Sequence, residues 1–154
     1  MLLENKIAVI YGAGGAIGGA VARAFARDGA TLFLTGRHRA SIETVARDVV
    51  AAGGSAEAAD VDALDEQSVN RHLQSVIDTS ERLDISFNAV GIPNTKILGV
   101  PLIDLDVEQF LLPIAIYAKS YFMTARMAAR RMVANRSGVI MTVTALHSRT
   151  GIPL

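Results

Sequence analysis

Hydrophobic positions along this chain follow two different periods. Short runs that are almost wholly apolar, such as residues 6–12 (KIAVIYG), predict strands that are buried on both faces of a sheet. In residues 16–28 (AIGGAVARAFARD) the apolar positions instead recur at helical spacing, and Gly29 follows where a helix C-cap is expected. The chain therefore begins with a strand, a loop and a helix.

The same unit repeats with short connections. Further strands are predicted at residues 30–36, 55–61, 83–91 and 137–145. Further helices are predicted at residues 40–52, 65–80 and 107–135. Alternation of this kind predicts a parallel sheet with right-handed crossovers and helices on both faces. We therefore expect a doubly wound α/β fold with five strands in three α/β/α layers, formed by residues 1–154 as one domain.

Composition excludes several classes of protein. Lys plus Arg number 15 and Asp plus Glu number 15, so no net charge would attract nucleic acid or an anionic membrane. The chain has no cysteine, which excludes disulfides and thiolate catalysis, and no pattern of metal ligands is found. No stretch of about 18 uninterrupted apolar residues and no cleavable leader pattern is present, so we predict a cytoplasmic protein.

A glycine-rich segment, residues 11–18 (YGAGGAIG), joins the first predicted strand to the first predicted helix. Doubly wound sheets bind dinucleotides at this place, because the N–H groups of the helix N-terminus face a pyrophosphate and glycines let it approach closely. A turn without a ligand is the alternative interpretation. The predicted pyrophosphate contacts are Gly12, Gly14, Gly15, Ala16, Ile17 and Gly18. We expect Gly18→Val to abolish cofactor binding while the fold survives.

The spacing of Gly12, Ala16 and Gly18 resembles the T-G-x-x-x-G-x-G pattern of the short-chain dehydrogenase/reductase family, with alanine at the middle glycine. The resemblance implies a Rossmann-type fold that binds a nicotinamide dinucleotide. It also implies a reaction in which hydride passes between the nicotinamide and a small carbonyl or alcohol substrate.

Two later segments resemble the same family and occur in the family's order. Residues 60–61 resemble its D-V segment, which implies that Asp60 contacts the adenine and that Val61 flanks the ring. Residues 88–91 (NAVG) resemble its N-N-A-G segment, although the two middle residues depart from that pattern. This match implies cofactor contacts from Asn88, Ala89 and Gly91.

The end of the second predicted strand favours NADP(H) over NAD(H). A site for NAD usually places an acid about 20 residues after the glycine loop, where it accepts a hydrogen bond from the ribose 2′-hydroxyl. Here Gly36 occupies that position, and Arg37 follows it. The guanidinium of arginine suits a 2′-phosphate, which a carboxylate would repel. A solvated basic loop is the alternative interpretation.

The catalytic residues of the family are the least well matched. Ala145 aligns with the serine that orients the substrate carbonyl, and the hydroxyls of Thr144 and Ser148 lie nearby in sequence. The family's tyrosine, with a lysine four residues later, would follow the last residue, Leu154. The family's asparagine in the long helix aligns with Tyr117, which more often packs than catalyses at such a position.

These observations predict an NADP(H)-dependent oxidoreductase of which residues 1–154 form the cofactor-binding part. A non-catalytic or sensory NADP(H)-binding module, or a truncated inactive product, is the alternative, and Ala145 favours it. The resemblance implies a homo-oligomer through residues 107–135. We expect the 154-residue chain alone to bind the cofactor without measurable reductase activity, because no tyrosine in it has a lysine four residues later.

Overall fold

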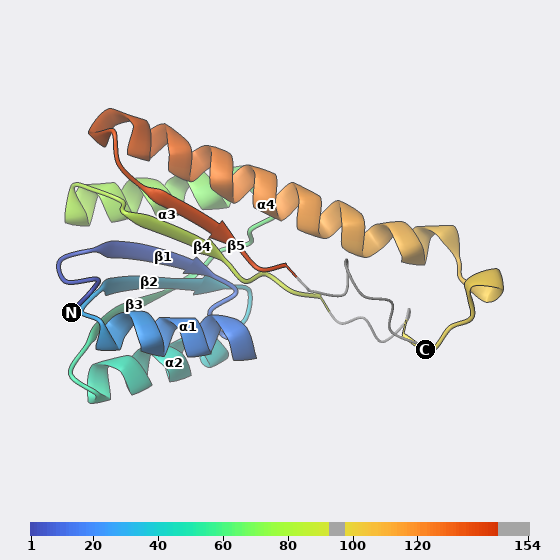
Figure 1. Cartoon of the computed structure of the whole chain (residues 1–154), viewed down its shortest axis with the longest axis horizontal. Helices are drawn as coiled ribbons and strands as arrows, with labels where there is room; N and C mark the ends of the chain where they lie inside the picture. Colours follow the sequence, from blue (N-terminus) through green and yellow to red (C-terminus); the bar gives the residue numbers. More distant parts are fainter. Residues whose placement is uncertain (93–97, 145–154) are drawn as a thin grey trace.

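Five parallel strands form one sheet in the computed structural model, which describes residues 1–92 and 98–144. The strand order is β3-β2-β1-β4-β5 (Figure 1). The predicted five-stranded, doubly wound sheet is therefore confirmed. The strands are β1 (Ile7–Tyr11), β2 (Thr31–Gly36), β3 (Ser55–Asp60), β4 (Ile85–Asn88) and β5 (Val139–Thr142).

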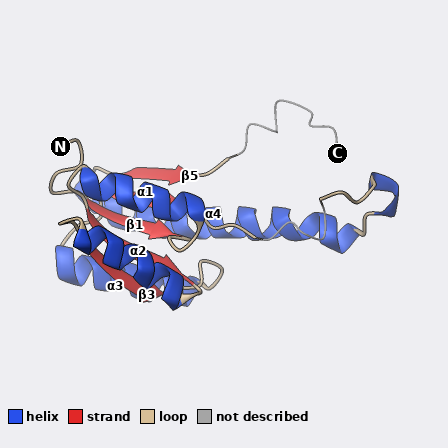
Figure 2. Ribbon diagram, turned by 90° about the horizontal axis from the view of Figure 1, so that it is seen from below, coloured by secondary structure: helices blue, strands red, loops and turns tan. Residues whose placement is uncertain are grey.

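Helices cover both faces of the sheet, which gives the predicted three layers. One face carries α1 (Ala16–Arg27) and α2 (Arg39–Ala51), and the other carries α3 (Glu66–Ser80) and α4 (Val107–Asn135), as Figure 2 shows. A short 3-10 helix, η1 (Leu102–Asp104), precedes α4. The long helix begins and ends at the residues that the sequence pattern predicts.

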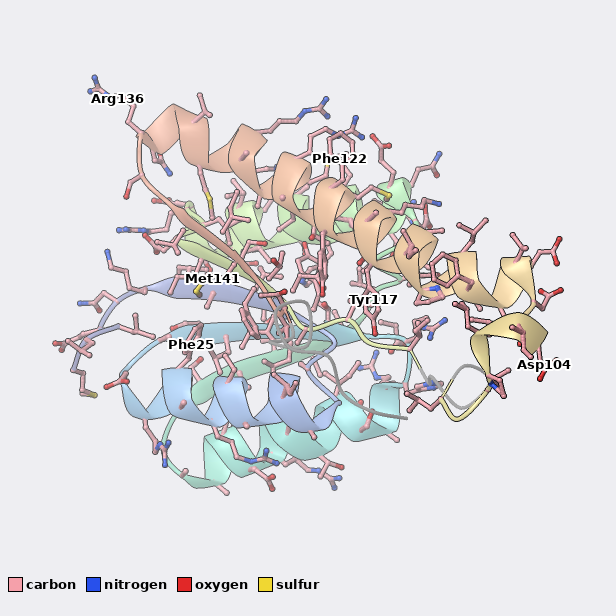
Figure 3. The ribbon with its side chains drawn as sticks, turned by 45° about the vertical axis from the view of Figure 1, so that its right-hand side comes forward. Phe25, Asp104, Tyr117, Phe122, Arg136 and Met141 are labelled. Atoms are coloured by element: carbon pink, nitrogen blue, oxygen red, sulfur yellow. The ribbon has the colours of Figure 1, made fainter. Side chains whose placement is uncertain are left out.

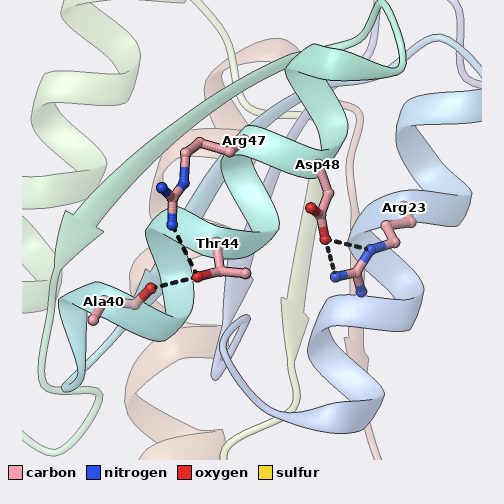
Figure 4. Close-up of polar contacts among 5 residues, drawn as sticks. All are labelled: Arg23, Ala40, Thr44, Arg47 and Asp48. Carbon is pink, nitrogen blue, oxygen red and sulfur yellow. Dashed lines mark hydrogen bonds and ion pairs between the residues drawn. The ribbon is translucent and has the colours of Figure 1, made fainter.

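The core beneath α1 and α2 is built from the apolar faces of these helices and alternate residues of the strands. Phe25 of α1 lies against Phe87 of β4 with ring centroids 6.4 Å apart, and Figure 3 shows Phe25 and Met141 on this side of the sheet. On the outer surface, Arg23 Nε donates to Asp48 Oδ2 at 3.2 Å and ties α1 to α2 (Figure 4).

A buried carboxylate joins the amino ends of β1 and β4. Asp84 Oδ2 accepts a hydrogen bond from Ile7 N at 2.9 Å, and Oδ1 pairs with Arg82 and lies 3.9 Å from Lys6 Nζ. The main chain of Asp84 also bonds across both strands, because its N–H donates to Ile7 O at 3.0 Å and its carbonyl accepts from Val139 N at 2.8 Å. We name Lys6, Ile7, Arg82 and Asp84 the amino-end cluster.

The N-terminal half of α4 extends beyond the carboxyl ends of the strands (Figures 1 and 2). Its apolar side chains there, such as Val107, Phe110, Leu111 and Ile114, are between 49% and 66% exposed. Farther along, Phe122 lies on the outer side of the helix (Figure 3) with the Arg126 guanidinium carbon 5.1 Å from its ring centroid.

Across residues 1–92 and 98–144, no helix has the length and apolarity needed to cross a membrane.

The second core, beneath α3 and α4, contains the buried hydroxyl of Tyr11. Tyr11 is 0% exposed, and its hydroxyl has no hydrogen-bond partner among the described residues. Burial therefore raises the pKa of Tyr11, an effect that Arg131 only partly opposes. A buried hydroxyl loses its hydrogen bonds to water, and here no hydrogen bond within the described residues replaces them, so it lowers the stability of the fold.

Replacing Tyr11 by phenylalanine is expected to raise the free energy of unfolding by about 1 kcal/mol, because the change removes only the unsatisfied hydroxyl. Chemical denaturation of both proteins measures the difference. Tyr121→Phe is the matched control: the Tyr121 hydroxyl donates to Val143 O at 2.8 Å, so the same change there should be destabilising by about 1 kcal/mol. A loss of stability in Tyr11→Phe would contradict the prediction.

Candidate functional site

A cavity of about 570 Å³ opens at the carboxyl ends of β1, β2, β3 and β4. This volume lies in the range of small-molecule and cofactor sites, and the edge is where doubly wound sheets bind their ligands. Its lining comes from the ends of β1 and β2, the loops after four strands, the first turns of α1 and α2, and α4. The lining residues are Tyr11, Gly12, Gly14, Gly15, Ala16, Ile17, Gly18, Gly36, Arg37, His38, Ser41, Ile42, Val61, Asp62, Ala63, Leu64, Ala89, Val90, Gly91, Ile92 and Ile116.

The glycine loop needs glycine at two positions for its own structure. Gly12 has a φ of 74°, and a Cβ on it would lie 2.6 Å from Ala89 O. A Cβ on Gly18 would lie 2.3 Å from Gly12 O, so the first turn of α1 packs directly on the loop main chain. The expectation that Gly18→Val leaves the fold intact is therefore not supported, because the clash involves main-chain atoms.

The N-terminus of α1 offers donors without a competing acceptor from the protein. Gly15 is the N-cap, no side chain caps the helix, and no acidic residue lies in its first turn. The first N–H groups of a helix have no partner within it, and the helix dipole favours an anion there. Gly15 is exposed at this point, with the nearest atom 3.4 Å from a Cβ built on it. This arrangement fits a phosphate group.

The end of β2 brings positive charge to the cavity. Arg37 and His38 line it, and no carboxylate of the described residues lies within 4.0 Å of the Arg37 guanidinium. Arg39 differs, because its Nε lies 2.6 Å from Glu43 Oε1 and its Nη1 lies 3.8 Å from Asp60 Oδ2. The hydrogen bond to Glu43 and the charges of both acids raise the pKa of Arg39.

Two of the predicted cofactor residues lie apart from the cavity lining. Asp60 points its carboxylate toward Arg39. Asn88 is 1% exposed; its Nδ2 donates to Thr124 Oγ1 at 2.9 Å and its Oδ1 accepts from Val90 N at 2.9 Å. Asn88 therefore fixes the end of β4 to α4, and its side chain is committed to the protein. The other residues predicted to contact the cofactor all line the cavity, including Arg37, Val61, Ala89 and Gly91.

Several lining residues are not indicated by any sequence pattern as cofactor contacts, notably His38, Asp62 and Ile116. His38 and Asp62 lie within two residues of predicted contacts. The sequence does not show that they lie on the side of their loops that faces the cavity. Ile116 comes from α4, far along the chain, and only the packing of that helix brings it to the cavity.

The residues near the predicted catalytic position form contacts within the protein. Tyr117 and Tyr121 lie with ring centroids 5.9 Å apart. Burial, with a smaller contribution from the charge of Tyr117, raises the pKa of Tyr121 above its ordinary value. Ala145 and Ser148 lie outside the described residues, and Thr144 is exposed at their border. Within the described ranges, no three His, Cys, Asp or Glu side chains are grouped so that they could hold a metal ion.

Comparison with known proteins agrees with this fold. A family model described as short chain dehydrogenase matches residues 6–154. L-rhamnose 1-dehydrogenase (NAD(P)(+)) of Azotobacter vinelandii (strain DJ) is 30% identical over 157 residues, covering 98% of this chain and 59% of that protein. The chain belongs to the short-chain dehydrogenase family, whose members are oxidoreductases that bind a nicotinamide dinucleotide.

Solved structures of similar sequence share the fold. A short-chain type dehydrogenase/reductase from Mycobacterium marinum matches with a TM-score of 0.87 at 29% identity, over 98% of this chain and 60% of that one. A metagenomic short-chain oxidoreductase in complex with NADP matches with a TM-score of 0.85 at 28% identity, over 99% of this chain and 67% of that one. The chain thus spans between 59% and 67% of the length of these three proteins.

Proposed function

We propose that the protein carrying this chain transfers hydride between NADP(H) and a small carbonyl or alcohol substrate. Residues 1–154 would supply the NADP(H)-binding part of that protein. The observation that carries the choice of NADP(H) is the end of β2, where Arg37 lines the cavity and Gly36 stands in place of an acid. The name of the Azotobacter relative, which acts with NAD(P)(+), and the NADP complex of the metagenomic relative are consistent with it.

In this proposal, neighbouring groups of cavity residues would contact successive parts of the dinucleotide. The N–H groups at the start of α1 and the glycine loop would hold the pyrophosphate, and Arg37 would bind the 2′-phosphate. Ala89, Gly91 and Ile116, at the end of β4 and on α4, would line the other end of the cavity. When bound, the nicotinamide ring supplies or accepts the hydride.

Replacing Arg37 by alanine tests the proposal. NADPH binding is expected to weaken by about 1 to 3 kcal/mol, because a charged hydrogen bond to the 2′-phosphate is lost, whereas NADH binding should hardly change. Isothermal titration calorimetry with both cofactors measures this difference. Arg39→Ala is the matched control, because Arg39 is paired with Glu43 and Asp60 and does not line the cavity. Equal losses for NADPH and NADH in Arg37→Ala would exclude the role of Arg37.

A second candidate function is NADP(H) binding without turnover. It is favoured by Ala145, a methyl group at the position where the family carries the serine hydroxyl. NADPH oxidation by the whole protein that carries this chain, in the presence of a panel of aldehydes and ketones, separates the two functions, because a binding module would retain NADPH affinity and oxidise none of it.

We also propose that the protein is cytoplasmic and that its copies associate through α4. The absence of cysteine suits a reducing compartment. The exposed apolar side chains of α4, among them Phe110 and Leu111, provide a surface of the kind that subunits bury against one another.

A further inference from the structure

Tyr121 connects α4 to the residue that follows β5. Its hydroxyl donates a hydrogen bond to Val143 O at 2.8 Å. The N–H group of Val143 donates to Asn88 O at 3.2 Å, at the end of β4. Val143 is therefore held at its amide group by the sheet and at its carbonyl group by a side chain of the long helix.

The carbonyl of Val143 needs this donor because the ladder between the two strands stops there. β4 and β5 pair in parallel as far as Asn88 and Thr142. Continuing the same register would bring Val90 N to Val143 O as its donor. Val90 N instead donates to Asn88 Oδ1 at 2.9 Å. The Tyr121 hydroxyl therefore takes the place of a strand donor that β4 does not supply.

A second hydroxyl of α4 holds the end of β4. Thr124 lies three residues after Tyr121, and its Oγ1 accepts a hydrogen bond from Asn88 Nδ2 at 2.9 Å. Asn88 and Thr124 are each 1% exposed, so water does not compete for this bond. Two side chains on neighbouring turns of one helix thus fix the ends of two strands.

These contacts lie at the end of the cavity away from Arg37. β1 lies between β2, which Arg37 follows, and β4, and residues 89–91 after β4 line the cavity on this side. Ile116 of α4 also lines it, and the next residue, Tyr117, has its ring centroid 5.9 Å from that of Tyr121. In the proposed function this end receives the nicotinamide ring.

We propose that Tyr121 is a positioning residue for the nicotinamide end of the cavity. By donating to Val143 O, it fixes α4 and its cavity residue Ile116 relative to the ends of β4 and β5. Without the hydroxyl, this part of α4 loses its connection to β5. The loops that would hold the adenosine part follow β1, β2 and β3, so they should respond little. This inference rests on the proposed function, because it takes the ligand to be a nicotinamide dinucleotide.

Tyr121→Phe in the whole protein that carries this chain tests this role by calorimetry with two ligands, NADPH and adenosine 2′,5′-bisphosphate. The bisphosphate has the adenosine part and the 2′-phosphate of NADPH but no nicotinamide. The dissociation constant of NADPH is expected to rise about fivefold, as for the loss of one hydrogen bond, and that of the bisphosphate to stay within about twofold. A general loss of stability would not distinguish the two ligands in a variant that circular dichroism shows to be folded.

Ser120→Ala is the matched control. The Ser120 hydroxyl donates to Tyr117 O at 3.2 Å, within α4, so its removal leaves both strand ends tied to the helix, and both dissociation constants should keep their wild-type values. The inference is overturned if Tyr121→Phe weakens both ligands equally, weakens the bisphosphate more, or changes neither. It is also overturned if Ser120→Ala weakens NADPH binding as much as Tyr121→Phe does. A wild-type protein that binds neither ligand would instead overturn the proposed function, and this inference with it.

Discussion

Gly18→Val is expected to lower the free energy of unfolding by about 3 kcal/mol and to abolish NADPH binding. The cause is steric, since a Cβ at this position would lie 2.3 Å from Gly12 O and 2.9 Å from Ala13 Cα. Both contacts are with main-chain atoms, so α1 and the loop after β1 must separate. Urea denaturation measures the loss of stability, and calorimetry measures the loss of binding.

Gly15→Val is the matched control for this prediction. Gly15 lies in the same loop, has a φ of −82°, and offers a new Cβ no neighbour closer than 3.4 Å. Stability should therefore change by no more than about 1 kcal/mol, as for a poorer N-cap residue. NADPH binding should still fall, because Gly15 lines the cavity. Wild-type stability in Gly18→Val would show that the close packing of α1 on the loop is dispensable.

His72 is expected to make the fold sensitive to acid. It lies half-buried on α3 with its ring 6.3 Å from that of Phe33, and its Nε2 has no partner among the described residues. Burial lowers the pKa of His72 from 6.5 to about 4. The unfolded chain therefore binds a proton more readily than the folded one between these pH values. The contribution of His72 to the free energy of unfolding is therefore at its maximum above pH 6.5, and it falls by up to about 3 kcal/mol as the pH approaches 4.

Unfolding free energies of the wild type, His72→Leu and His72→Gln across this pH range check the prediction. Both variants remove the titrating group but differ in packing, so their stabilities near neutral pH will differ from each other. Their dependence on pH should be equally reduced relative to the wild type, because carboxylates contribute the same slope in all three proteins. An unchanged slope in both variants would show that His72 does not carry the effect.

The fourth and fifth strands are shorter than the sequence pattern predicts, by two residues at the start and three at the end. Residues 83–91 and 137–145 were predicted as strands, whereas β4 and β5 are Ile85–Asn88 and Val139–Thr142. The two strands pair with each other along four residues, from Ile85 with Val139 to Asn88 with Thr142, and they end together. The turn in which Asn88 Oδ1 accepts from Val90 N ends β4, and no hydrophobic pattern reveals this bond.

Site residues could be predicted from the sequence where the main-chain geometry requires one residue type. They were harder to predict where the direction of a side chain decides whether it reaches the cavity. Gly12 and Gly18 are recognisable by spacing because no other residue fits the close contacts they make. Asp60 and Asp62 are two residues apart and chemically identical, so sequence alone favoured the one that matches a family pattern. In the structure Asp62 lines the cavity, whereas Asp60 Oδ2 lies 3.8 Å from Arg39 Nη1.

Because of the amino-end cluster, we expect the two ends of the sheet to tolerate amino-acid substitutions to different degrees. Asp84 joins β1 to β4 through Ile7 and two cationic side chains at the end opposite the cavity. Substitutions that alter ligand preference at Arg37 therefore leave this connection untouched, whereas loss of Asp84 would weaken the scaffold for any ligand. Such a separation lets the loops around the cavity diversify in evolution while the strands beneath them keep their register.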